Sequence, residues 1–160
     1  MLVMAREAAF STWKTARAWS PTGLYLLVSG VWLVVVAGVV GFIYNSDFAI
    51  DTRPGSSSDI FGILETNGWH NLAGLGLGVA SLAFAVRPER ARFGALSLGA
   101  AMVITTIALM IWDPRTFGLA SNDEDQVLHA LAGIGGIAAA LATRSAPISE
   151  APDERATLAM

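Results

Sequence analysis

The feature that most constrains the fold is an apolar run from Leu24 to Tyr44, 21 residues without a charged side chain. A helix needs about 20 apolar residues to cross the roughly 30 Å hydrocarbon core of a bilayer, so this run predicts a transmembrane helix. Three more apolar segments occupy residues 69–86, 93–112 and 127–143. Because backbone polar groups in lipid must find partners within the protein, we expect all four segments to be helices.

The composition of the chain also indicates a membrane protein. Of its 160 residues, 54% are hydrophobic and 14% are charged, with a mean hydropathy of +0.55, whereas soluble domains carry about 25% charged residues. The formal net charge of −3 offers no basic surface to a nucleic acid. The chain has no cysteine, which excludes disulfides and thiolate metal sites.

The basic residues indicate the orientation. Eight of the ten Lys and Arg residues lie before the first apolar segment, between the second and third, or after the fourth. Since basic residues in short loops stay on the cytoplasmic side, we expect a multi-pass protein of the bacterial inner membrane with both termini in the cytoplasm. The predicted fold is an all-α, up-down-up-down bundle of four transmembrane helices. The predicted regions are an N-terminal arm over residues 1–22, the transmembrane domain over residues 23–144 and a flexible polar tail over residues 145–160.

Small residues recur at intervals of three or four positions along the predicted helices, a pattern typical of close helix packing in membranes. We expect these residues to bring helices together within the bundle or against a protein partner. They are Gly74, Gly78, Ala95, Gly99, Ala132, Gly133, Gly136 and Ala140.

The second and fourth segments resemble each other. Residues 69–83, WHNLAGLGLGVASLA, align with residues 128–142, LHALAGIGGIAAALA, and the alignment places the only two histidines, His70 and His129, in register. Such an internal repeat predicts two related helical hairpins. It places the two histidines at a similar depth, one helical turn inside the outer surface.

These motifs resemble those of a bacterial family of small four-helix membrane proteins that is known only as a domain of unknown function. The resemblance rests on the two span starts, WHNLAGLGLG and LHALAGIGG, and on Gly41-Phe42 at the end of the first segment, and it covers residues 22–143. It implies the four-helix architecture and supplies no activity, substrate or catalytic residue.

The two histidines allow three interpretations. They could ligate a b-type haem or a metal ion, because imidazole binds iron, copper and zinc and cofactors lie in the cores of helix bundles. They could instead be structural, each bonded to a loop carbonyl or a carboxylate, with Asp125 one turn before His129. A proton relay is the third interpretation. Two histidines fall short of the three or four ligands that zinc normally takes.

The two outer loops carry eight acidic residues against two arginines. An acidic outer face attracts cations or a basic partner, although acids at a helix start are also explained by capping, and Ser121-x-x-Glu124 has the spacing of a capping box. The residues assigned to this acidic outer face are Glu65, Asp123, Glu124 and Asp125.

Signatures of enzymes and pumps are missing from the sequence. It contains no phosphate-binding loop, GxSxG or HExxH motif, and no ionisable residue at the centre of a span. We therefore expect a non-enzymatic structural or accessory subunit, embedded in lipid, that meets a protein partner or forms a homo-oligomer and needs no cofactor or nucleic acid. The alternatives are a redox protein that binds haem b or a metal through His70 and His129, and a cation-conducting oligomer whose pore is lined by Thr105, Thr106 or Ser81.

Overall fold

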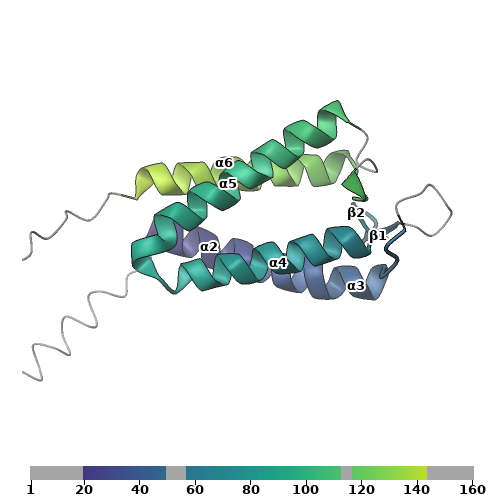
Figure 1. The fold of residues 1–160 in the computed structure, drawn as a ribbon, viewed down its shortest axis with the longest axis horizontal. Coiled ribbons are helices and arrows are strands. Elements are labelled where there is room, and N and C mark those ends of the chain that lie inside the picture. Colours follow the sequence, from purple (N-terminus) through teal and green to yellow (C-terminus); the bar gives the residue numbers. More distant parts are fainter. Residues whose placement is uncertain (1–19, 50–56, 113–116, 144–160) are drawn as a thin grey trace, which may run out of the picture.

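The computed structural model describes residues 20–49, 57–112 and 117–143, and these form a mostly helical molecule (Figure 1). Most of the predicted N-terminal arm, residues 1–19, and the whole predicted tail, residues 145–160, lie outside the described residues.

The first apolar segment forms one long helical element in three parts. These are α2 (Pro21–Trp32), the π-helical η1 (Leu33–Val40) and α3 (Gly41–Tyr44). Ser20 caps the start, because its hydroxyl accepts a 3.1 Å hydrogen bond from the N–H of Gly23. Pro21 suits the first helical position because it has no N–H that would be left without an acceptor there.

Three more helices follow: α4 (Gly68–Ala85), α5 (Pro88–Ile111) and α6 (Asp123–Ala142). The helix α5 begins five residues before the predicted span and α6 begins four residues before it. The predicted spans were bounded where the apolar residues give way to polar and charged ones. The helices themselves start earlier, because a helix can include charged residues that remain outside the hydrocarbon core.

A small antiparallel sheet precedes α4, and the sequence did not predict it. Its strands, β1 (Ser58–Ile60) and β2 (Leu64–Thr66), pair with Ser58 opposite Thr66. The turn between them includes Gly62 at φ +73°, a left-handed conformation that glycine adopts without a steric cost. The sheet is a minor addition to the helices and closes one end of the molecule (Figure 1).

Three of the helical elements are long and apolar enough to cross a membrane: Pro21–Tyr44, Pro88–Ile111 and Asp123–Ala142. These three helices agree with the prediction that the chain is a membrane protein. The remaining long helix, α4, carries His70 and Asn71 in its first turn and is not among the three.

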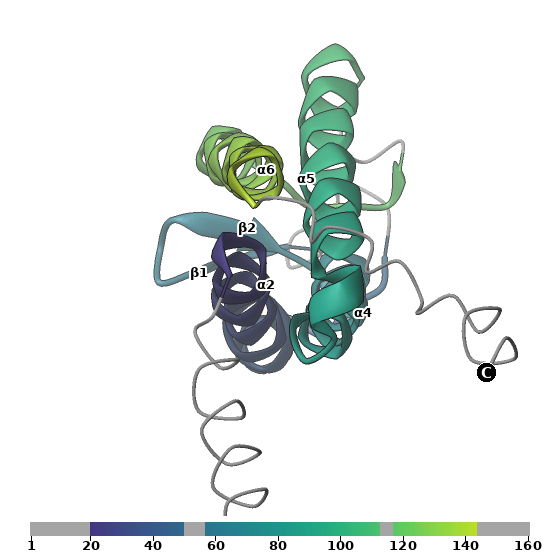
Figure 2. The same ribbon diagram turned by 90° about the vertical axis from the view of Figure 1, so that its left-hand side faces the viewer.

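The long helices pack as two antiparallel hairpins, in which α2, α4 and α6 run along the length of the molecule and α5 is tilted across them (Figures 1 and 2). In one hairpin α4 packs along α2 and η1, and in the other α5 packs extensively against α6. The two ends of the described chain lie close together, and the N–H of Thr22 donates a 3.3 Å hydrogen bond to Oγ1 of Thr143 there. The core between the hairpins includes Leu26, Leu98 and Met102.

The small residues singled out in the sequence lie at helix–helix contacts within this single chain. A Cβ atom on Gly99 would lie 2.8 Å from the carbonyl oxygen of Gly133, and one on Gly74 would lie 2.7 Å from the Cβ of Ala37. A Cβ atom on Gly78 would lie 3.0 Å from the carbonyl oxygen of Gly30, and one on Gly136 would lie 2.9 Å from that of Ala95. Ala95 and Ala140 are fully buried, and Ala132 is half-buried.

Candidate functional site

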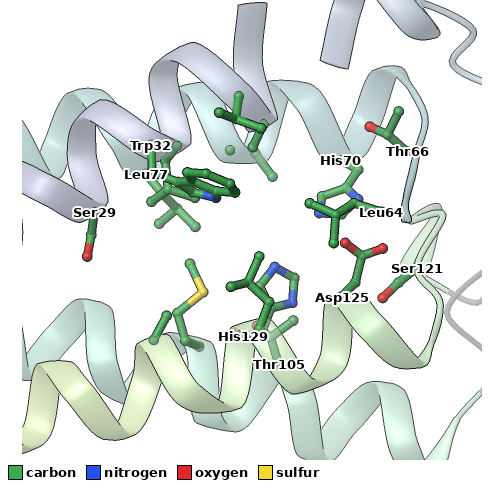
Figure 3. Close-up of a pocket in the computed structure, with 18 of the residues that line it drawn as sticks. Ser29, Trp32, Leu64, Thr66, His70, Leu77, Thr105, Ser121, Asp125 and His129 are labelled. Carbon is green, nitrogen blue, oxygen red and sulfur yellow. The ribbon is translucent and has the colours of Figure 1, made fainter. Parts of the chain in front are cut away.

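A cavity of about 360 Å³ lies between the two hairpins (Figure 3). The cavity is partly open to the outside of the molecule, and its volume is much larger than the space that a single water molecule needs. Its walls come from α2, η1, β1, β2, α4, α5 and α6, and most of the lining side chains are apolar.

α5 diverges from α4 toward the end of the molecule that carries the sheet (Figures 1 and 2). There Ile60, Leu64 and Thr66 of the sheet contribute to the wall. Side-chain amides hold this end in place: Nδ2 of Asn122 donates a 2.6 Å hydrogen bond to the carbonyl of Ile63.

The polar lining residues gather near the sheet, whereas Ser29, Trp32 and Leu77 lie toward the other end (Figure 3). Figure 3 shows side chains from α4 and α6 meeting at the polar end. The polar residues there are Glu65, Thr66, His70, Ser121, Asp125 and His129.

The two histidines converge in this cavity. The ring centroids of His70 and His129 are 5.7 Å apart, and their planes form an angle of 66°. Asn67 places His70 in the first turn of α4, because its side chain accepts a 2.9 Å hydrogen bond from the N–H of His70. The internal alignment predicted a similar depth for the two rings, and the structure adds that they are in contact.

The two imidazoles differ in their hydrogen bonds. Nδ1 of His70 lies 3.1 Å from the carbonyl oxygen of Glu65, and the carbonyl of Ala120 also faces this ring. Because a carbonyl only accepts, Nδ1 of His70 carries a proton. Nδ1 of His129 is buried and has no hydrogen-bond partner in the part of the chain that the structure describes. His70 is therefore bonded to a backbone carbonyl, as expected, although that carbonyl belongs to strand β2 and not to a loop, whereas no bond joins Nδ1 of His129 to Asp125.

Asp125 was assigned to the acidic outer face, but its side chain is buried, with 3% of its surface exposed, and it lines the cavity. It forms a capping box with Asn122, whose N–H donates a 3.3 Å hydrogen bond to the Asp125 carboxylate and whose side chain accepts from the N–H of Asp125 at 3.0 Å. The capping box therefore consists of Asn122 and Asp125, one residue later than the predicted pair of Ser121 and Glu124.

The other acids of the predicted outer face differ in exposure. Asp123 and Glu124 are exposed, whereas Glu65 is half-buried and lines the cavity. The hydroxyl of Ser121, which was expected to cap α6, is buried without a hydrogen-bond partner among the described residues.

The geometry bears on which cofactor the histidines could hold. Within residues 20–49, 57–112 and 117–143, no group of three or more His, Cys, Asp or Glu side chains is placed to bind a metal ion. A haem needs its two axial imidazoles on opposite faces of a flat ring, with about 4 Å between the ligating nitrogens at bond lengths of about 2 Å. His70 and His129 contact each other edge to face, so the described arrangement leaves no slot for a macrocycle between them.

The hydroxyls that a conducting pore would require are mostly engaged elsewhere. Ser81 donates a 2.7 Å hydrogen bond to the carbonyl of Leu77, and Thr106 donates a 3.0 Å bond to the carbonyl of Met102, each within its own helix. Thr105 lines the cavity between the hairpins. This geometry adds no support to cation conduction.

Sequence reasoning missed several residues of this site. Tyr25, Ser29, Trp32 and Ser121 line the cavity, and the Tyr25 hydroxyl donates a 2.9 Å hydrogen bond to the carbonyl of Ala132. No single-sequence signal marks these residues, because each looks like an ordinary member of a helix or loop until the two hairpins are placed against each other.

The comparisons with known proteins show a family and add no activity. No curated protein and no solved structure matches the chain. A family model matches residues 24–142, which is more than half of the chain. The chain belongs to the family described as domain of unknown function DUF4383.

Proposed function

We propose that this protein crosses the membrane four times and holds a small lipid-soluble molecule in the cavity between its hairpins. The cavity is the observation that carries the proposal. Its volume of about 360 Å³ lies within the roughly 300–1,000 Å³ range of ligand pockets. Like such pockets, it is mainly apolar, with a few polar groups gathered at one end.

The direction of the helices supports the fourth span. α2 and α5 run the same way along the molecule (Figure 1), and both belong to elements apolar enough to cross a membrane. If both cross, the chain between them has to return to the side from which it started, and α4 is the helix that runs back.

Two phenylalanine substitutions on α5 test the proposed cavity ligand. Ala101 lines the cavity, whereas its neighbour Ala100 is exposed, so Ala101→Phe fills the space and Ala100→Phe is a matched control. Each protein is purified in mild detergent and examined by native mass spectrometry, with circular dichroism as a check of folding. We expect the wild type and Ala100→Phe to retain an additional lipid-soluble molecule that Ala101→Phe has lost. Equal retention by both variants, or none in the wild type, would count against the proposal.

A two-histidine metal site is a second proposal. It is supported by the contact between the His70 and His129 rings, which brings the two imidazoles to one place in the cavity. Elemental analysis of the purified wild type should show a bound transition metal that both His70→Ala and His129→Ala lose. An absorption spectrum recorded before and after reduction tests haem in the same samples, and a featureless, metal-free wild type would exclude both.

A non-enzymatic accessory role is a third proposal, and we assign no catalytic residue. It is supported by an exposed row of small residues on α4, namely Gly76, Ala80 and Ala83. A Cβ atom on Gly76 would meet nothing within 4 Å, so another helix can approach closely there. Crosslinking in native membranes should give a dimer or a partner adduct that Gly76→Leu abolishes. Recovery of monomer alone from the wild type would refute this role.

A further inference from the structure

We propose that the polar end of the cavity binds an uncharged hydroxyl group, so that the molecule held there is a lipid-soluble alcohol or hydroquinone and not an anionic lipid. This inference rests on the proposed function, since it names the chemistry of the molecule that the cavity holds.

The charges at the polar end exclude an anionic head group. Two carboxyl groups, those of Glu65 and Asp125, line the cavity, and no Lys or Arg lines it within residues 20–49, 57–112 and 117–143. Asp125 is 3% exposed, so its carboxyl group is shielded from solvent. A phosphate or carboxylate placed beside it would bury a negative charge with no cation among the described lining residues to balance it, which is unfavourable in a low-dielectric site.

The unmatched hydrogen-bonding groups indicate a group that both donates and accepts. Ser121 is 9% exposed, and its hydroxyl has no partner among the described residues. Nδ1 of His129 is buried without a described partner as well. The Asp125 carboxylate accepts from the N–H of Asn122 and retains further lone pairs. The Ser121 hydroxyl can donate and accept a hydrogen bond. The Asp125 carboxyl group accepts when it is ionised and can also donate when it is protonated.

A hydroxyl group fits this combination better than the other small polar groups. It can donate to Asp125 and accept from Ser121, which Figure 3 shows side by side at one end of the cavity. An ether or a ketone only accepts, and an ammonium group only donates, so each of these would leave one protein group unmatched.

The rest of the cavity suits the apolar body of such a molecule. From the polar end the cavity extends toward Trp32 and Leu77 (Figure 3), and Val36 and Leu98 also line it. An aliphatic chain or an aromatic ring can occupy this space, and these are the two sources that the experiment separates.

The experiment compares four probes by native mass spectrometry of the full chain in detergent: 1-dodecanol, dodecyl methyl ether, dodecanoate and a short-chain ubiquinol. We expect dodecanol, ubiquinol or both to bind at least about tenfold more tightly than the ether and dodecanoate, because neither of these can donate a hydrogen bond and a buried polar group left unmatched costs about 1–3 kcal/mol. Preference for dodecanol identifies an aliphatic alcohol, and preference for ubiquinol identifies a hydroquinone. Equal binding of all four probes, or tightest binding of dodecanoate, would overturn the inference.

Two sets of variants separate this inference from the proposed function. Ser121→Ala should weaken dodecanol binding about fivefold or more, whereas Ser81→Ala should not change it, because Ser81 bonds to its own helix. If Ala101→Phe abolishes the binding of all four probes but none is preferred, the cavity ligand stands and the hydroxyl assignment fails. If Ala101→Phe changes nothing, both proposals fail.

Discussion

Two glycines on α6 provide a sharp test of how tightly the helices of the second hairpin pack. A Cβ atom on Gly133 would lie 2.9 Å from the carbonyl oxygen of Gly99 and 3.0 Å from the backbone nitrogen of Val103. A Cβ atom on Gly135 would meet only the ring of Tyr25, at 3.7 Å, which is an ordinary contact. Gly133→Ala therefore pushes α5 away from α6, whereas Gly135→Ala adds the same methyl group to the same helix without a collision.

The two substitutions share one energy term and differ in another. Alanine is favoured over glycine within a helix by about 0.8–1.0 kcal/mol, so Gly135→Ala should leave the free energy of unfolding unchanged or raise it by up to about 1 kcal/mol. Overpacking typically costs about 1–3 kcal/mol, and in Gly133→Ala the methyl group meets backbone atoms, which cannot rotate away. We therefore expect Gly133→Ala to be less stable than Gly135→Ala by about 1–3 kcal/mol.

The measurement is equilibrium unfolding in mixed micelles of mild detergent and SDS, followed by circular dichroism for the wild type and both variants. The difference between the two alanine variants is the informative quantity, because it cancels helix propensity. If the two variants agree within about 0.3 kcal/mol, or if Gly133→Ala is the more stable, α5 and α6 do not pack as closely as described and the reasoning fails.

Three other substitutions probe the groups that hold the end of the cavity together and the contact between the hairpins. Asn122→Ala removes the cap of α6 and the bond to the carbonyl of Ile63, so we expect a loss of about 1–2 kcal/mol in unfolding free energy and faster amide hydrogen exchange in β1 and β2. Gly41→Ala places a Cβ atom against the amide of Asn71, which is fully buried and donates a 2.6 Å hydrogen bond to the carbonyl of Asn45. A thermal melt of this variant should show a loss of at least about 1 kcal/mol in unfolding free energy. A melt like that of the wild type would contradict the contact. Tyr25→Phe removes a hydrogen bond between the hairpins, and chemical unfolding should show a loss of about 1 kcal/mol, with no change if the bond is absent in solution.

The helices were largely predictable because their apolar runs are long and uncharged. The first predicted segment, Leu24 to Tyr44, differs from the observed element Pro21–Tyr44 by three residues at one end. The strands β1 and β2 were not predictable, since three residues are too few for an alternating pattern to be recognised. The π-helical stretch η1 consists of the same apolar residue types as an α-helix.

The cavity could be predicted only in fragments. The internal alignment placed His70 and His129 at one depth, but their contact depends on how the two hairpins are rotated against each other, and periodicity does not report that rotation. The position of Asp125 shows the same limit. An acid in a first helical turn is explained by the helix dipole whichever way it faces, so the sequence did not reveal that this carboxylate turns inward.

The capping box of α6 links the start of that helix to the contents of the cavity. The Asp125 carboxylate accepts from the N–H of Asn122 and also forms part of the cavity wall. A bound molecule that competes for this carboxylate weakens the first turn of α6, whereas one that leaves the cap intact stabilises it. Because linkage is reciprocal, fraying at that helix end changes the affinity of the cavity by the same free energy. If the cavity holds a molecule as proposed, hydrogen exchange at the amides in the first turn of α6 should differ between the filled and the empty protein.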